Sequence, residues 1–238
     1  MFTKISPLIF LWALLNPIIV SAESSSTHHH GFDSFHAFTL EADAGLSHGS
    51  NVEQWDFDGW YGSDNHKLWM KSEGERKDDK TEKLELWALY SKNIATFWDA
   101  QIGIRHDTKP LNTSYFAVGL AGLARYNFET DLHLFLSDEG DGSVRFLQEY
   151  ELLLTQKAIL KPFTEIDFYF QDVPEQYIGK SFSSGSIGMQ FKYEFTRKFG
   201  PYMQIEYERL FEKTKQFSVA EGERGEFVTF SIGLFIAF

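Results

Sequence analysis

The carboxy-terminal stretch Glu226–Phe238 alternates between large apolar residues and smaller ones. Every even position from Val228 to Phe238 carries a large apolar side chain, and the odd positions carry mainly small residues, with Phe235 as the exception. A period of two residues predicts a β-strand with one apolar face and one smaller, wetter face. At the end of a soluble protein such a strand would leave an unpaired edge that favours aggregation. In a closed barrel it pairs with the first strand and turns its apolar face to lipid, so the stretch predicts a transmembrane β-barrel.

The last eight residues also resemble a carboxy-terminal signal of bacterial outer-membrane proteins. That signal has a polar residue, a glycine two positions later and then spaced apolar residues ending in an aromatic one, as Ser231, Gly233 and Phe238 do here. The outer-membrane assembly machinery reads this signal. The resemblance implies that this machinery and outer-membrane lipid are partners of the chain, and that the chain resides in the outer membrane of a Gram-negative cell.

The amino-terminal end has the pattern of a secretory signal peptide. Lys4 precedes the apolar run Ile5–Val20, and small residues follow this run as a cleavage site. A membrane-spanning helix is the alternative, but Pro17 and other breaks leave the run short of the ~20 residues that a span needs. The sequence therefore predicts a leader over residues 1–22.

The remaining chain divides into a short tail and a long strand-rich region. Residues 23–35 have no hydrophobic periodicity, which predicts a flexible tail in the periplasm. Residues 36–238 contain twelve strand-like segments, which predicts a single all-β antiparallel barrel. The expected strands are 36–46, 52–61, 67–73, 83–91, 96–105, 113–123, 126–137, 143–155, 158–171, 183–195, 199–211 and 226–238.

The connections between these segments alternate in length. Tight turns alternate with connections that include four long, charged stretches: 74–82, 106–112, 172–182 and 212–225. Bacterial barrels combine short periplasmic turns with longer outer loops and an even number of strands. The pattern therefore places both chain ends in the periplasm.

Alternation within the segments also predicts which side chains face the barrel interior. In segment 126–137, leucines share one face with Tyr126, whereas Glu129, Asp131 and His133 share the other. A slip of one residue would put these polar groups into lipid, so the register is well specified. The same parity gives a carboxylate-rich set of lumen candidates: Asp56, Asp58, Glu73, Glu129, Asp131, His133, Glu149, Glu165, Asp167, Glu206 and Glu208.

Two interpretations of this acidic lumen stay open. Small barrels fill their own interiors, so opposite charges could simply pair and hold the barrel shut. Alternatively, the surplus of carboxylates makes the lumen favour cations, whereas a channel for acidic sugars would need a basic lining. The net charge of −12 argues against nucleic acid as a partner and favours a cation.

Four histidines near the mature amino terminus are candidate metal ligands. His28, His29 and His30 are consecutive in the tail, and His36 begins the first expected strand. Adjacent imidazoles can chelate Cu(II), Ni(II) or Zn(II), and because the neutral ring is the ligand, binding should weaken below about pH 6. The alternative is an incidental polar tail.

Nine short blocks in the strand region resemble one known family. They are Trp55–Trp60, Lys67–Glu75, Ala88–Ser91, Phe97–Asp99, Gly119–Leu123, Leu134–Asp138, Tyr150–Gln156, Gln171–Glu175 and Pro201–Arg209. Together they resemble the copper-resistance protein B family of Gram-negative outer membranes, from about Gln54 to the end of the chain.

The resemblance implies an outer-membrane barrel that binds copper ions and serves copper tolerance, with a periplasmic copper protein as a candidate partner. Members of this family tend to have an amino-terminal region rich in Met and His. The mature tail here has three consecutive His and no Met, which favours imidazole ligation of Cu(II) over thioether ligation of Cu(I). Met70 lies in one of the blocks, but its parity points it outward with Leu68.

Two other functions fit a barrel of this size. One is a plugged structural barrel, or an anchor for a periplasmic copper protein, with no transport of its own. The other is an outer-membrane lipase, which needs Ser and His together on the lipid-facing wall. Parity points His133 inward and offers no outward pair. We therefore expect a protein without catalytic residues.

Overall fold

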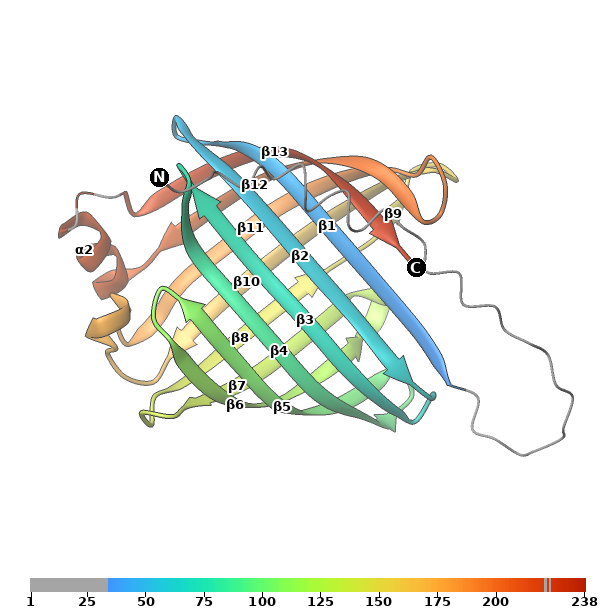
Figure 1. Ribbon diagram of the computed structural model, residues 1–238, viewed down its shortest axis with the longest axis horizontal. Coiled ribbons are helices and arrows are strands. Elements are labelled where there is room, and N and C mark those ends of the chain that lie inside the picture. The colour runs from blue at the N-terminus through green and yellow to red at the C-terminus, as the bar shows by residue number, and fades with distance from the viewer. Residues whose placement is uncertain (1–33, 221, 223) are drawn as a thin grey trace, which may run out of the picture. The chain divides into compact units, whose positions relative to one another are not determined.

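The computed structural model describes residues 34–220, 222 and 224–238. The predicted leader, most of the predicted tail and the candidate ligands His28, His29 and His30 lie outside the described residues. The described part forms a closed antiparallel β-barrel (Figure 1). Its strands are β1 (Phe35–Ser47), β2 (Ser50–Gly62), β3 (His66–Lys77), β4 (Lys80–Ala95), β5 (Trp98–Lys109), β6 (Thr113–Leu123), β7 (Glu129–Ser137), β8 (Gly142–Glu149), β9 (Leu152–Leu153), β10 (Ala158–Tyr169), β11 (Ser181–Tyr193), β12 (Phe199–Leu210) and β13 (Glu226–Ala237).

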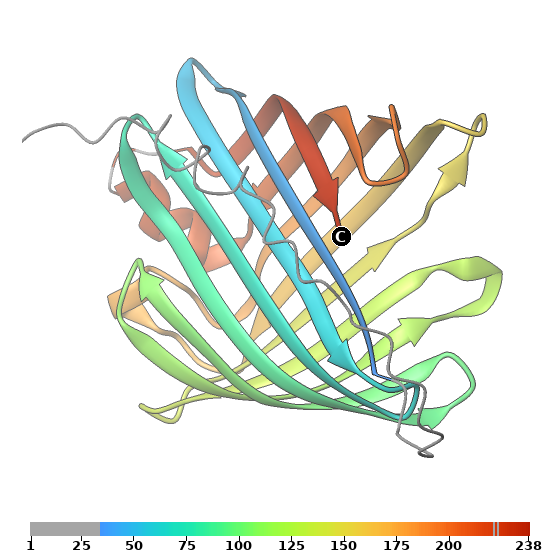
Figure 2. The ribbon, with the colours of Figure 1, turned by 45° about the vertical axis from the view of Figure 1, so that its right-hand side comes forward.

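The first and last strands close the barrel. β1 pairs with β13 from Thr39 opposite Ala237 to Ser47 opposite Thr229, and Figure 2 shows the two strands side by side. The backbones of Phe38 and Phe238 exchange two hydrogen bonds of 3.0 Å at the end of this pairing. β8 and β9 both pair with β10, so they form one interrupted crossing. The barrel therefore has twelve crossings, and the predicted fold is confirmed.

The outer wall is apolar because apolar and polar residues alternate along the strands. On β7, Leu134 and Leu136 are half exposed to the outside, whereas His133 and Phe135, which alternate with them, are buried. Met70 also points outward, as its parity predicts. Strands of about ten tilted residues are long enough to cross the hydrocarbon layer of a bilayer. Within the described ranges, no helix is long and apolar enough to span a membrane.

The two ends of the barrel differ in their connections. At the end where β1 starts and β13 finishes, called the terminal end here, the turns are short; the opposite end is called the loop end. The loop end has two long connections. One runs between β10 and β11 and contains the short helix η2 (Pro174–Gln176), and the other contains α2 (Glu212–Ala220).

Two segments expected as long loops are largely strand. β3 continues to Lys77 and β4 starts at Lys80, so only Asp78 and Asp79 form the turn between them. Both aspartates have positive φ angles (47° and 69°), as a two-residue hairpin turn requires. β5 similarly extends to Lys109. Charged residues in these stretches suggested loops, but here they continue the ladder.

Two expected strands are shorter than predicted. β7 begins at Glu129, because Arg125–Asn127 forms a 3-10 turn in which Tyr126 has a φ of 66° and is 80% exposed. The predicted strand 143–155 breaks after Glu149. The apolar face that was expected to start at Tyr126 therefore starts only after this 3-10 turn, within β7.

Candidate functional site in the barrel lumen

Charged side chains meet inside the barrel across strands that are not neighbours. The Lys71 ammonium on β3 lies 3.0 Å from Asp131 on β7, and the Lys67 ammonium lies 2.7 Å from Asp99 on β5. Since β3 pairs only with β2 and β4, these contacts must be made through the interior. The carboxylate-rich face of the strands therefore lines the lumen.

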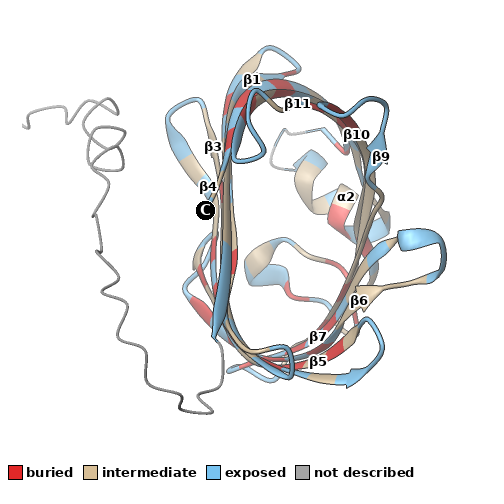
Figure 3. Ribbon diagram, turned by 90° about the vertical axis from the view of Figure 1, so that its right-hand side faces the viewer, coloured by how far each residue is buried: buried red, intermediate tan, exposed pale blue. Residues whose placement is uncertain are grey.

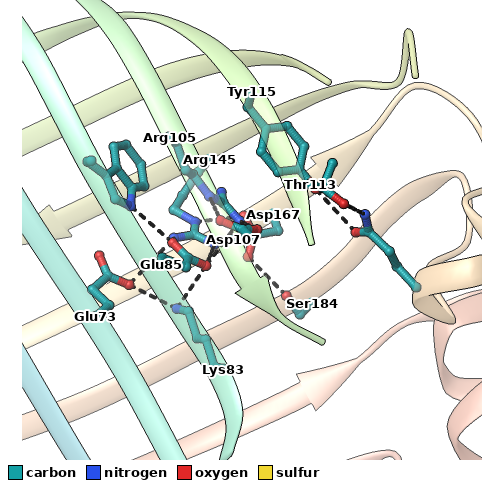
Figure 4. Close-up of polar contacts among 12 residues, drawn as sticks. Glu73, Lys83, Glu85, Arg105, Asp107, Thr113, Tyr115, Arg145, Asp167 and Ser184 are labelled. Carbon is teal, nitrogen blue, oxygen red and sulfur yellow. Dashed lines mark hydrogen bonds and ion pairs between the residues drawn. The ribbon is translucent and has the colours of Figure 1, made fainter. Parts of the chain in front are cut away.

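Two arginines organise the largest ionic cluster of this lumen (Figure 4). The Arg145 guanidinium on β8 donates to both oxygens of Glu85 on β4 at 3.0 and 3.2 Å. It also donates to Asp167 at 3.0 Å. The Arg105 guanidinium binds Asp107 through two hydrogen bonds and lies 3.0 Å from Glu85. Both arginines and Glu85 are buried, so these are charge pairs withdrawn from water.

Aromatic side chains pack around the same cluster. The Arg105 guanidinium lies 4.9 Å from the ring centres of Tyr115 and Phe135, and 5.4 Å from that of Trp87. Leu89 and Ala117 complete this core and are fully buried. The inward residues of β4 to β8 thus form a packed half of the lumen, with Trp87, Leu89, Tyr115, Ala117 and Phe135 as its apolar core.

A second polar group braces the seam between β1 and β13. Glu41 on β1 accepts hydrogen bonds from Lys192 and from Gln190 on β11, the latter at 2.9 Å. The Tyr202 hydroxyl on β12 donates to Asp43 at 2.7 Å. Gly233 makes room for this contact, because a Cβ there would lie 2.6 Å from both the Tyr202 ring and Asp43.

Sequence reasoning missed the two acidic residues of this brace. Glu41 and Asp43 alternate with Leu40, Ala42 and Ala44, a pattern that could have placed both carboxylates inside. The contacts themselves could not be inferred, because each skips at least one strand.

Carboxylates lie directly opposite one another on four consecutive strands. Glu41 pairs with Asp56, Asp56 with Glu73, and Glu73 with Glu85. Like charges in direct opposition destabilise a sheet unless they are compensated. Glu41, Glu73 and Glu85 each have a basic partner, whereas Asp56 makes no ion pair or hydrogen bond with any described residue, and its side chain is exposed to the lumen. Asp56 is therefore the one carboxylate of this row of four that has no ion-pair partner among the described residues.

The other predicted lumen residues all lie on inward positions of their strands. Asp58 and Asp131 share Lys71, and Glu165 and Asp167 share Arg145. Two more carboxylates form ion pairs: Glu73 with Lys83 at 2.9 Å and Glu149 with Lys161 at 3.0 Å. His133 is hydrogen-bonded to Gln101 at 2.8 Å, and Glu206 to Gln204 at 3.4 Å. Glu129 stands opposite Glu149 in the strand pairing, and Glu208 opposite Ser186.

His36 lies away from this lumen. It stands opposite Tyr61 in the ladder and shares the outward face of β1 with Phe38, whose ring centre is 5.9 Å away. Among the described residues, no three His, Asp or Glu side chains come together in a way that could hold a metal ion. The lumen is therefore an acidic surface without a ready-made ligand set in the part of the chain that the structure describes.

An outward Ser–His pair, which the sequence reasoning did not find, occurs at the loop end. His106 Nδ1 on β5 lies 3.0 Å from the Ser114 hydroxyl on β6. No described residue bonds the other ring nitrogen. A nucleophilic serine needs a base that a third group orients, so the pair lacks one part of a hydrolase site.

Solved structures of outer-membrane barrels share this fold. The NanC porin aligns with a TM-score of 0.59 at 15% identity, over 83% of this chain and 98% of that one. The KdgM porin aligns with a TM-score of 0.55 at 9% identity, over 84% of this chain and 99% of that one. Identities this low support a common architecture alone.

Sequence comparison is more specific. Copper resistance protein B of Escherichia coli is 36% identical over 193 residues, which are 81% of this chain and 65% of that protein. The copper resistance protein B homolog of Pseudomonas syringae pv. tomato is 35% identical over 71% of this chain and 58% of that protein. The chain thus spans somewhat less than two thirds of these relatives. The family model described as copper resistance protein B precursor (CopB) matches residues 33–238, and the chain belongs to this family.

Proposed function

We propose that this barrel binds copper ions, or passes them through its acidic lumen, in the outer membrane, and so contributes to copper tolerance. Family membership supports copper as the ligand or cargo. The observation that carries the role of the lumen is the row of opposed carboxylates, in which Asp56 has no basic partner. A lumen with excess negative charge favours cations.

The chemistry of the inward face favours Cu(II) over Cu(I). The described methionines Met70, Met189 and Met203 all point outward and are 39–47% exposed. The lumen therefore offers oxygen donors, which suit a divalent ion better than the thioether-preferring Cu(I). Separate carboxylates without a closed ligand set would hold such an ion weakly, as passage requires.

We further propose a division of labour along the chain. Residues 1–22 serve as a leader, as the precursor status of the family suggests. The tail 23–35 lies in the periplasm, where His28, His29 and His30 bind Cu(II) and His36 assists them. A periplasmic copper protein and the outer-membrane assembly machinery are the partners in this scheme.

The proposed tail histidines should bind Cu(II) more tightly than the separate carboxylates of the lumen. Deleting residues 23–33 should therefore abolish the tighter Cu(II) binding and leave the barrel folded. The matched variant replaces His28, His29 and His30 with Ala, and it should lose the same sites. Titration of refolded protein with Cu(II), Ni(II) and Zn(II) measures the stoichiometry, and binding should weaken below about pH 6 as the imidazoles protonate. Unchanged Cu(II) stoichiometry in both variants would remove the tail from the mechanism.

Asp56→Lys should lower the cation-to-anion permeability ratio of the barrel in planar bilayers by about tenfold, since the substitution changes the charge by two at a lumen carboxylate that has no ion-pair partner. Asp79→Asn is a suitable control, because Asp79 is fully exposed in a turn at the loop end. An equal ratio in both variants would contradict the proposed role of Asp56.

A plugged barrel that anchors a periplasmic copper protein is the second candidate. The packed half favours it, because buried ion pairs and aromatic rings already fill the lumen from β4 to β8. Absence of single-channel conductance in the refolded protein would favour this candidate. In either case we expect no ester hydrolysis from the His106–Ser114 pair.

A further inference from the structure

The two long connections at the loop end are joined to each other. The Gly179 backbone N–H donates to the Thr214 hydroxyl of α2 at 3.0 Å, in a buried contact. The Lys213 ammonium lies 2.6 Å from Asp172, which also accepts a 2.8 Å hydrogen bond from the Lys180 backbone. These donors hold the pKa of the Asp172 carboxyl below its usual value, with the backbone bond from Lys180 as the main cause. Residues 172–180 and α2 therefore act as one unit, called the cap below.

The cap is attached to the inner wall of the barrel. The Gln176 amide donates to the Tyr115 hydroxyl at 3.1 Å and lies 3.4 Å from the Thr113 hydroxyl, both on the inward face of β6. Val173 of the same loop is 4% exposed. Figure 3 shows the barrel end-on, with α2 inside the ring of strands. The cap thus lies over the lumen and not beside it.

The attachment is slight compared with that of a strand. The Lys213–Asp172 pair is largely exposed, and such pairs contribute little to stability. Gln176 links the loop to the wall, Thr214 links it to α2, and Lys215 of α2 makes a 3.5 Å, half-exposed contact with Glu226 at the start of β13. Segments with few buried contacts open locally at much lower cost than the sheet that carries them.

We propose that the cap is a movable closure of the loop end that controls entry of small cations into the lumen. The inference that the cap controls copper entry rests on the proposed function. The inference that the cap controls the flow of small cations does not depend on it. In the closed state Gln176 holds the loop against Tyr115 and Thr113, and Thr214 holds it against α2. Release of either contact opens the mouth.

Gly179 offers a way to open the cap. A Cβ at this position would lie 2.3 Å from the Lys213 Cβ and 3.0 Å from the Thr214 nitrogen, so any side chain must push the loop away from α2. Gly179→Val should raise the KCl conductance of the refolded protein in planar bilayers by about tenfold. Glu175→Val places the same side chain at an exposed position of the same loop and should leave the conductance unchanged.

A crosslink tests the opposite direction. The chain has no cysteine, so Gln176→Cys with Thr113→Cys introduces a single pair. A short, reducible bis-methanethiosulfonate linker between the two thiols should abolish channel openings, and reduction should restore them. Folding of each variant is checked by the heat-modifiable electrophoretic mobility of a folded barrel. If Gly179→Val does not fold, the crosslinking experiment still tests the proposal.

Equal conductance of the linked and reduced protein, or of Gly179→Val and wild type, would overturn the proposal. Since KCl carries the current, this failure is separate from a failure of the copper proposal. A Gly179→Val barrel that conducts K⁺ but neither binds nor passes Cu(II) would retain the cap and refute the copper function.

Discussion

Replacing Arg145 with Leu should lower the free energy of unfolding of the barrel by about 3–5 kcal/mol. Arg145 neutralises Glu85 and Asp167 at 3.0 Å and lies within 3.6 Å of Glu73 and Glu165. Removing one member of a buried charge cluster leaves the others desolvated and uncompensated, which costs far more than the pair contributes when intact. Urea-induced unfolding in detergent micelles or liposomes measures the difference.

Arg209→Leu is the matched control. Arg209 is about half exposed, and its contact with Glu226 is 3.7 Å long, so its loss should cost about 0–1 kcal/mol. Equal destabilisation by the two substitutions would mean that water solvates the lumen cluster. It would contradict the close packing described for the inward residues of β4 to β8.

Replacing Leu134 with Arg should destabilise the membrane-inserted barrel by about 2–4 kcal/mol, the cost of an arginine near the middle of the lipid-facing wall. Leu134 lies in the middle of β7 and is 51% exposed on the outer face. Reversible unfolding from liposomes provides the measurement. Val219→Arg is the control, because Val219 is similarly exposed but lies on α2, outside the strands. A stable Leu134→Arg barrel would show that this face does not meet hydrocarbon.

The wall of the barrel was predictable because its two faces differ so strongly in polarity. On β7, leucines alternate with Asp131 and His133, and no other register avoids placing charge in lipid. The closing pair of strands followed from the same argument applied to Glu226–Phe238. Alternation is a local signal, and the outer face depends on little else.

The interior was predictable only in part. Parity indicates that Lys71 and Asp131 face inward, but it cannot show that they meet, because the curvature of the barrel decides which distant strands approach each other. Strand ends beyond the bilayer carry no polarity contrast, which is why the stretch from Gly74 to Glu82 was misread as a loop. The link between Gly179 and Thr214 depends on backbone approach, for which the residue types give no signal.

The seam brace also affects how the chain matures. Glu41 and Asp43 bind partners that lie 149 to 159 positions further along the chain. Contacts of such long range form late in folding, since the intervening loop must close first. The carboxylates of β1 therefore stay without these partners until β11 and β12 have joined the barrel. A chain that ends before β11 would lack these partners and would also leave the edge of β1 unpaired, so it could not close the barrel.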